Sequence, residues 1–120
     1  VRAVPGDFAA FVGDASTFHA ALSLGAAGGI LAVANVLPKA CVQLMKSFES
    51  GDLETARRLQ LEMLPMATAV TTQHGIPGLK AVMDDLGYYG GETRLPLPPV
   101  TDEIRAELKA LLAQARAITA

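Results

Sequence analysis

Residues 8–34, FAAFVGDASTFHAALSLGAAGGILAVA, determine the fold that we expect for this chain of 120 residues. Residues 8–12 form a short apolar run, and residues 29–34 form a second one. Between them, residues 16–24 carry apolar side chains at helical spacing. The order strand, helix, strand predicts one βαβ unit.

The cap of the intervening helix is expected at Ser16 or Thr17, with Asp14 as a further candidate, and its end at Gly25. The two strands show no polar alternation, so both faces of each are expected to be covered. Strands joined by a helix run parallel, because the crossover returns the chain to the same end. Two parallel strands alone would leave open edges and bare faces. The sheet is therefore expected to be larger than this chain can supply, with the missing strands in a portion that precedes Val1.

The remaining residues are expected to be nearly all helical. Pro38 suits the first turn of a helix over residues 39–49. Asp52 is expected to cap a second helix that runs to about Gln73. Pro65 lies inside that helix and is expected to kink it or to split it near Leu64.

Glycine and proline divide the last third of the chain into shorter elements. Residues 74–78 (HGIPG) are predicted to form a loop, and residues 79–86 a short helix that ends at Gly87. Residues 88–99 are predicted to form an extended surface strap. Thr101 is expected to cap the final helix.

The composition excludes several classes of function. A net charge of −2 without a dense basic patch argues against nucleic-acid binding. No apolar run approaches the roughly 20 residues of a membrane span, and no signal peptide is seen. The single cysteine, Cys41, is expected to be a buried structural thiol in a reducing compartment, so a cytoplasmic location is expected. Hydrophobic residues reach 51% against 18% charged ones, which fits either a compact, alanine-rich helical protein or apolar surface that another part of a protein covers.

Several motifs, in this order, resemble one family of enzymes. Gly13 and Asp14 follow an apolar strand, and residues 25–36 read GAAGGILAVANV. Residues 75–80 read GIPGLK, and residues 87–97, GYYGGETRLPL, follow them. This series is similar to the C-terminal part of the dihydrodipicolinate synthase / N-acetylneuraminate lyase family of pyruvate-dependent aldolases. The sequence of these motifs is most similar to the 4-hydroxy-2-oxoglutarate aldolase and dihydrodipicolinate synthase branches.

The resemblance implies an α/β fold, namely the C-terminal fragment of a (β/α)₈ TIM barrel. Such a barrel needs about 250 residues, roughly twice the length given. Residues 8–12 and 29–34 would be its last two parallel strands. Residues 1–50 would form the last two βα units, and residues 51–120 a helical C-terminal domain.

The resemblance also implies the chemistry of the intact enzyme. Members of the family form a Schiff base between pyruvate and a lysine on the sixth strand, which would lie before Val1. The intact enzyme is expected to be a lyase that acts on pyruvate or another small 2-oxo acid, without a metal or organic cofactor. It is expected to be a homo-oligomer, a tetramer in the intact family. This chain alone is expected to lack every catalytic residue and to be inactive.

Two residues remain as expected substrate contacts. Gly13 ends the first strand, where a side chain would crowd a ligand, and the alternative is a plain strand-end turn. Ile30 matches a family position whose backbone carbonyl faces the bound pyruvate, and the alternative is a residue of the barrel interior. Lys80 is interpreted as structural, and neither His19 nor His74 has a partner at metal-ligand spacing. A different class of function also stays open: a non-catalytic helical module that folds or oligomerises by itself.

Overall fold

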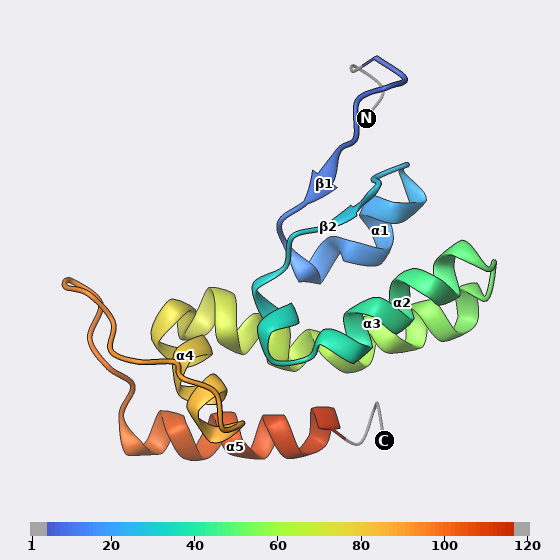
Figure 1. The fold of residues 1–120 in the computed structure, drawn as a ribbon. Helices are drawn as coiled ribbons and strands as arrows, with labels where there is room; N and C mark the ends of the chain where they lie inside the picture. The colour runs from blue at the N-terminus through green and yellow to red at the C-terminus, as the bar shows by residue number, and fades with distance from the viewer. Residues whose placement is uncertain (1–4, 117–120) are drawn as a thin grey trace.

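The computed structural model describes residues 5–116 and shows two short strands backed by a set of helices (Figure 1). The elements, in chain order, are β1 (Phe11–Val12), the 3₁₀-helix η1 (Ala15–Thr17), α1 (Phe18–Ser23), β2 (Gly28–Gly29), the 3₁₀-helix η2 (Ala32–Asn35), α2 (Pro38–Glu49), α3 (Leu53–Thr68), the π-helix η3 (Ala69–Gln73), α4 (Gly75–Asp85) and α5 (Asp102–Arg116).

The predicted parallel βαβ unit is confirmed, but its strands are shorter than the sequence indicated. β1 pairs with β2 in parallel, with Phe11 opposite Gly28 and Val12 opposite Gly29. The expected second strand over residues 29–34 is mostly wrong, because Ala32–Asn35 form a 3₁₀-helix. Periodicity could not separate these cases, since a continuous apolar run is equally typical of a buried helical turn.

Apolar side chains on this small sheet are exposed within the chain. Phe8 is 60% exposed, Phe11 57% and Ile30 77%. Strands this apolar are normally covered on both faces. The sequence predicted that another portion of a protein would cover these strands. The described residues leave that apolar surface exposed.

The helix that joins the strands has Thr17 at its N-cap position, one of the two expected residues, and a 3₁₀ turn precedes it. Asp14 is the N-cap of η1, and its Oδ1 accepts a hydrogen bond from the Ser16 amide at 2.8 Å. Thr17 precedes α1 but makes no side-chain capping bond. Gly25 follows the helix with a φ of 90°, a left-handed conformation that favours glycine and confirms the predicted end.

Helices α2 and α3 begin where the sequence predicted. Pro38 occupies the first turn of α2, and the Asp52 side chain caps α3 by accepting from the Thr55 amide at 3.1 Å. The expected split near Leu64 is wrong, because α3 continues through Pro65 to Thr68. Pro65 lies on the exposed side of α3, so water can reach the carbonyl group that loses its amide partner.

The predicted loop over residues 74–78 is wrong, because α4 already begins at Gly75. Pro77 lies in the first turn of this helix, where the missing amide hydrogen has no intrahelical partner to lose. Gly78 lies where a Cβ would meet the His74 Cβ at 2.6 Å and Leu108 Cδ1 at 3.6 Å. Its lack of a side chain lets α4 pack closely against the end of η3 and against α5.

Residues 88–99 carry no helix or strand and cross the outside of α4 before α5, which confirms the predicted strap (Figure 1). Thr101 accepts from the Ile104 amide at 3.4 Å and caps α5 as expected. One hydrophobic core runs from Ala15 on η1 to Ala115 on α5 and joins residues on both sides of residue 50. The division into units 1–50 and 51–120 stays a prediction, and residues 1–4 and 117–120 lie outside the described residues.

Candidate functional site at the strand ends

The carboxyl ends of β1 and β2 lie side by side. The Ile30 amide donates to the Val12 carbonyl oxygen at 2.9 Å, which extends the parallel ladder by one bond. Gly13 follows Val12 directly. The two residues that the sequence predicted as substrate contacts, Gly13 and Ile30, are therefore neighbours at one edge of the sheet.

This edge is open within the chain. A Cβ added at Gly13 would meet no atom within 4 Å. Ile30 is 77% exposed. Ligands of parallel α/β proteins bind outside the carboxyl ends of the strands. The geometry is compatible with a pocket wall, and the contact roles of Gly13 and Ile30 stay predictions.

The turn after Gly13 is held by its own polar groups. Asp14 accepts from the Ser16 amide, and the Thr17 hydroxyl donates to the Asp14 carbonyl oxygen at 3.2 Å. The hydrogen bond from the Ser16 amide lowers the pKa of Asp14 below its usual value. Asp14 therefore serves as an ionised helix cap and is poorly suited to donate a proton.

Sequence reasoning missed Gln60, which joins this turn to α3. Its Nε2 donates to the Ala15 carbonyl oxygen at 2.9 Å, and its Oε1 accepts from the His19 amide at 2.9 Å. Gln60 is the buried polar residue that the described core contains. A signal existed in the sequence, since Gln60 lies at helical spacing from Ala56 and Met63 on the apolar stripe of α3.

None of the four lysines lies on β1 or β2. Lys39 and Lys46 are on exposed positions of α2, and Lys109 is on α5. Lys80 donates from Nζ to the Gly90 carbonyl oxygen at 2.8 Å and to the Glu92 carbonyl oxygen at 3.0 Å. Lys80 thus holds the strap against α4, as its structural interpretation predicted.

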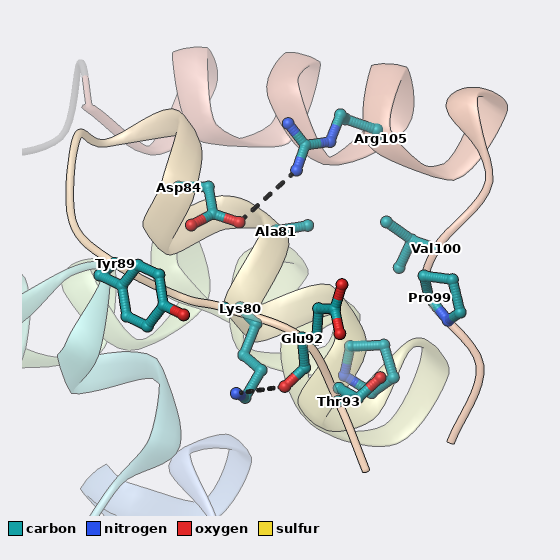
Figure 2. Close-up of a pocket in the computed structure, with 11 residues that line it drawn as sticks. Lys80, Ala81, Asp84, Tyr89, Glu92, Thr93, Pro99, Val100 and Arg105 are labelled. Atoms are coloured by element: carbon teal, nitrogen blue, oxygen red, sulfur yellow. Dashed lines mark hydrogen bonds and ion pairs between the residues drawn. The ribbon is translucent and has the colours of Figure 1, made fainter. Parts of the chain in front are cut away.

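A groove of about 880 Å³ lies between α4, the strap and the start of α5 (Figure 2). Its charged lining includes Lys80, Asp84, Glu92 and Arg105. The cations are already engaged, because Lys80 binds backbone carbonyls and Arg105 pairs with Asp84 at 3.8 Å. The groove therefore offers no free amine nucleophile.

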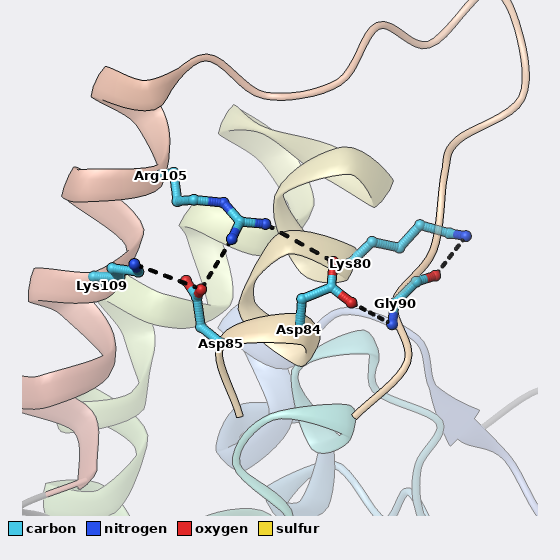
Figure 3. A network of polar contacts seen from close by, with 6 residues as sticks. All are labelled: Lys80, Asp84, Asp85, Gly90, Arg105 and Lys109. Atoms are coloured by element: carbon cyan, nitrogen blue, oxygen red, sulfur yellow. Dashed lines mark hydrogen bonds and ion pairs between the residues drawn. The ribbon is translucent and has the colours of Figure 1, made fainter. Parts of the chain in front are cut away.

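Ion pairs next to this groove join α4 to α5 (Figure 3). Arg105 NH1 lies 3.1 Å from Asp85 Oδ1, and Lys109 Nζ lies 3.7 Å from the same oxygen. Asp84 Oδ1 accepts from the Gly90 amide at 2.8 Å. These contacts bind the last helix and the strap to one face of α4, which is a structural role.

The Cys41 thiol and the imidazole rings of His19 and His74 also make packing or ion-pair contacts. Cys41 is buried beside the Met63 sulfur at 3.9 Å, and burial raises the pKa of its thiol to about 11. It is therefore a protonated packing residue, as expected, and a poor nucleophile. The His19 ring packs edge-on against Phe48, and His74 Nε2 lies 3.5 Å from Glu107 Oε2.

Within residues 5–116, no three His, Cys, Asp or Glu side chains gather in a way that could hold a metal ion. In the same part of the chain, no helix combines the length and the apolar character needed to cross a membrane.

A parallel βαβ unit with open strand ends, backed by helices, defines an α/β arrangement with a parallel sheet. Residues 1–115 match the dihydrodipicolinate synthetase family, and the chain belongs to that family.

Curated relatives and solved structures agree with this assignment. The chain is 37% identical over 91 residues to a 4-hydroxy-tetrahydrodipicolinate synthase of Geobacter sulfurreducens, a match that covers 76% of this chain and 31% of the relative. It is 33% identical over 113 residues to the enzyme of that name from Methanothrix thermoacetophila, covering 94% of this chain and 38% of the relative.

Among solved structures, the 4-hydroxy-tetrahydrodipicolinate synthase of Methylacidiphilum fumariolicum is similar with a TM-score of 0.87 and 26% identity, over 98% of this chain and 39% of that one. The dihydrodipicolinate synthase of Thermotoga maritima is similar with a TM-score of 0.83 and 28% identity, over 92% of this chain and 37% of that one. The chain thus spans less than two-fifths of the length of these four proteins.

Proposed function

We propose that this chain is the C-terminal part of a pyruvate-dependent Schiff-base lyase of the dihydrodipicolinate synthase type. In this proposal it supplies one wall of the substrate pocket and the helices that support it. The observation that carries the proposal is the pair of open strand ends, where the Ile30 amide meets the Val12 carbonyl oxygen beside Gly13. The family match over residues 1–115 supports the reaction class.

In this proposal β1 and β2 are the last two strands of a (β/α)₈ barrel, and the helices from α3 onward form a C-terminal domain. The exposed Phe8, Phe11 and Ile30 support a larger sheet, because such apolar surface is normally buried in a parallel barrel. The limited coverage of the relatives supports the same view. The partner of the strands would be the N-terminal portion of the barrel, and the intact enzyme would be a homo-oligomer.

The chemistry divides between the two portions. A lysine amine of the N-terminal portion would form an iminium with pyruvate, and that iminium withdraws electrons from the adjacent carbon. Gly13 would leave room for the ligand, and the Ile30 carbonyl would face the bound pyruvate. The described lysines do not lie at the strand ends, which supports placing the nucleophile elsewhere.

Trapping of the iminium tests the proposal. The intact protein is incubated with pyruvate and sodium borohydride, and each digested peptide is weighed by mass spectrometry. We expect one reduced pyruvate adduct on a lysine outside this chain, and no adduct when this chain is treated alone. Succinate in place of pyruvate is the control, since it has no ketone to form an imine.

The absence of an adduct on the intact protein would contradict the proposal and favour the alternative, a non-catalytic helical module. An adduct on Lys39, Lys46, Lys80 or Lys109 would contradict the division of roles.

A further inference from the structure

We propose that Gln60, on α3, is a positioning residue that holds the turn after Gly13 and thereby fixes this part of the pocket wall. The inference rests on the proposed function of Gly13 and Ile30. Gln60 lies 47 positions after Gly13 in the sequence, on an element that belongs to the helical region.

The Gln60 side chain uses both ends of its amide on one short segment. Its Nε2 donates to the Ala15 carbonyl oxygen at 2.9 Å and to the Ser16 carbonyl oxygen at 3.3 Å. Its Oε1 accepts from the His19 amide at 2.9 Å. One side chain therefore binds the backbone of the turn at three points.

The bonds of Asp14 and Thr17 hold the first part of this turn, and Gln60 adds bonds that these local groups do not supply. Thr17 stands at the N-cap position of α1 but makes no side-chain capping bond. The Oε1 of Gln60 takes that role for the amide of His19, the second residue of the helix. Ala15 is 2% exposed and Gln60 9%, so water has little access to replace the bond between them.

The position of the turn determines the position of Gly13. Only Asp14 separates Gly13 from Ala15, whose carbonyl oxygen Gln60 binds, and the Asp14 cap leaves this short segment little freedom. On the other side, Gly13 follows Val12 in the β ladder. A small displacement of a group that contacts substrate weakens catalysis far more than it weakens folding. Loss of the Gln60 bonds should therefore shift the backbone of the turn and, with it, the position of Gly13 in the pocket wall.

The test uses Gln60→Met in the intact protein, since methionine has a similar length and volume but forms none of the three bonds. The readout is the pyruvate concentration that gives half-maximal adduct formation with borohydride. The variants are compared at a temperature at which each is folded, because an unfolded fraction in equilibrium with the folded protein would itself raise this concentration. We expect it to rise roughly tenfold, equivalent to about 1.4 kcal/mol.

Two variants serve as controls. Met66→Ala removes buried packing from the same helix, because Met66 is 1% exposed, and it makes no hydrogen bond to the turn. Gln43→Met makes the same chemical change at an exposed position of α2. Both should keep the half-saturating concentration of the unmodified protein, even though Met66→Ala lowers the melting temperature.

The outcomes separate this inference from the proposed function. If Gln60→Met leaves the half-saturating concentration unchanged while the unmodified protein forms the adduct, the positioning role is wrong and the proposed function stands. An equal rise in Met66→Ala would also overturn it, since general destabilisation would then explain the effect. If Gln60→Met does not fold, Gln60→Glu replaces it: this change keeps the acceptor for the His19 amide and removes the amide donor. If the unmodified protein forms no adduct, the proposed function fails, and this inference fails with it.

Discussion

Lys80 and Gly90 hold each other in place across the space between α4 and the strap. The Lys80 ammonium donates to the Gly90 carbonyl oxygen at 2.8 Å. The Cα of Gly90 lies so close to α4 that an added Cβ would collide with the Lys80 carbonyl oxygen. Figure 3 shows the same glycine also donating its amide to Asp84, at 2.8 Å. Three contacts therefore fix the strap at Gly90. This arrangement leads to two predictions.

Substitution Gly90→Ala is expected to lower the free energy of unfolding by roughly 1–3 kcal/mol, the usual cost of forcing an extra methyl group into a closely packed site. The strap must shift to relieve the collision with Lys80, and its bond to Asp84 weakens as it moves. Urea unfolding followed by circular dichroism measures the change. Gly6→Ala is the matched control, because a Cβ at Gly6 meets no atom within 4 Å. Equal stability of the two variants would show that the strap does not press on α4.

Substitution Lys80→Met is expected to loosen the strap without removing the pyruvate adduct. The Lys80 bonds to the Gly90 and Glu92 carbonyl oxygens are lost, and the free energy of unfolding should fall by about 1 kcal/mol. Limited proteolysis should cut residues 88–99 faster. Lys109→Met should change stability less, because its pair with Asp85 is 3.7 Å long and its side chain is 59% exposed. If a folded Lys80→Met protein formed no adduct, the structural role assigned to Lys80 would be wrong.

Substitution Gly13→Val is expected to weaken pyruvate binding while leaving stability nearly unchanged. The new side chain would point into space that this chain leaves empty, so under the proposed function any collision would be with the ligand or with the rest of the proposed barrel. We expect the half-saturating pyruvate concentration in the borohydride assay to rise at least roughly tenfold. Gly6→Val introduces the same side chain at another open position. A Gly13→Val protein that binds pyruvate normally would remove Gly13 from the pocket wall.

Sequence reasoning predicted the helices well where local signals act alone. Pro38, Asp52 and Thr101 mark helix starts, and Gly25 marks a helix end, because each acts on backbone groups within a few residues. It was wrong about a loop over residues 74–78 and about a split of the helix near Leu64, where glycine and proline suggested a break. At residues 74–78, packing of Gly78 against Leu108 allows the helix to begin earlier. At Pro65, the exposed position of the proline allows the helix to continue.

The candidate site was only partly predictable for a similar reason. That Gly13 and Ile30 are neighbours follows from strand order, since parallel strands end at the same edge of a sheet, whereas the contact role of Ile30 came from the family resemblance and stays a prediction. The place of Gln60 does not follow from strand order, because its partners lie more than 40 positions away in the sequence and become neighbours only when α3 packs against the turn. The family resemblance indicated which strands these are, but it carried no information on that long-range contact.

Cys41 is expected to make stability fall between about pH 9 and pH 11. Burial raises the pKa of its thiol in the folded protein from 9.0 to about 11. In this interval the unfolded chain has lost the thiol proton while the folded protein keeps it, so rising pH favours unfolding. Below pH 9 both states keep the proton, and the contribution of Cys41 is constant.

The size of this effect is roughly 1–2 kcal/mol once partial solvation of the thiolate is taken into account. Lysine and tyrosine side chains titrate in the same interval, so the measured quantity is the difference between the unmodified protein and Cys41→Ala. Urea unfolding at several values from pH 8 to pH 11 gives that difference. Cys41→Ala should be less stable at pH 8, because a buried side chain has been shortened, and the gap should narrow as the pH rises. A constant gap would mean that the Cys41 thiol ionises equally in both states, which contradicts its burial beside Met63.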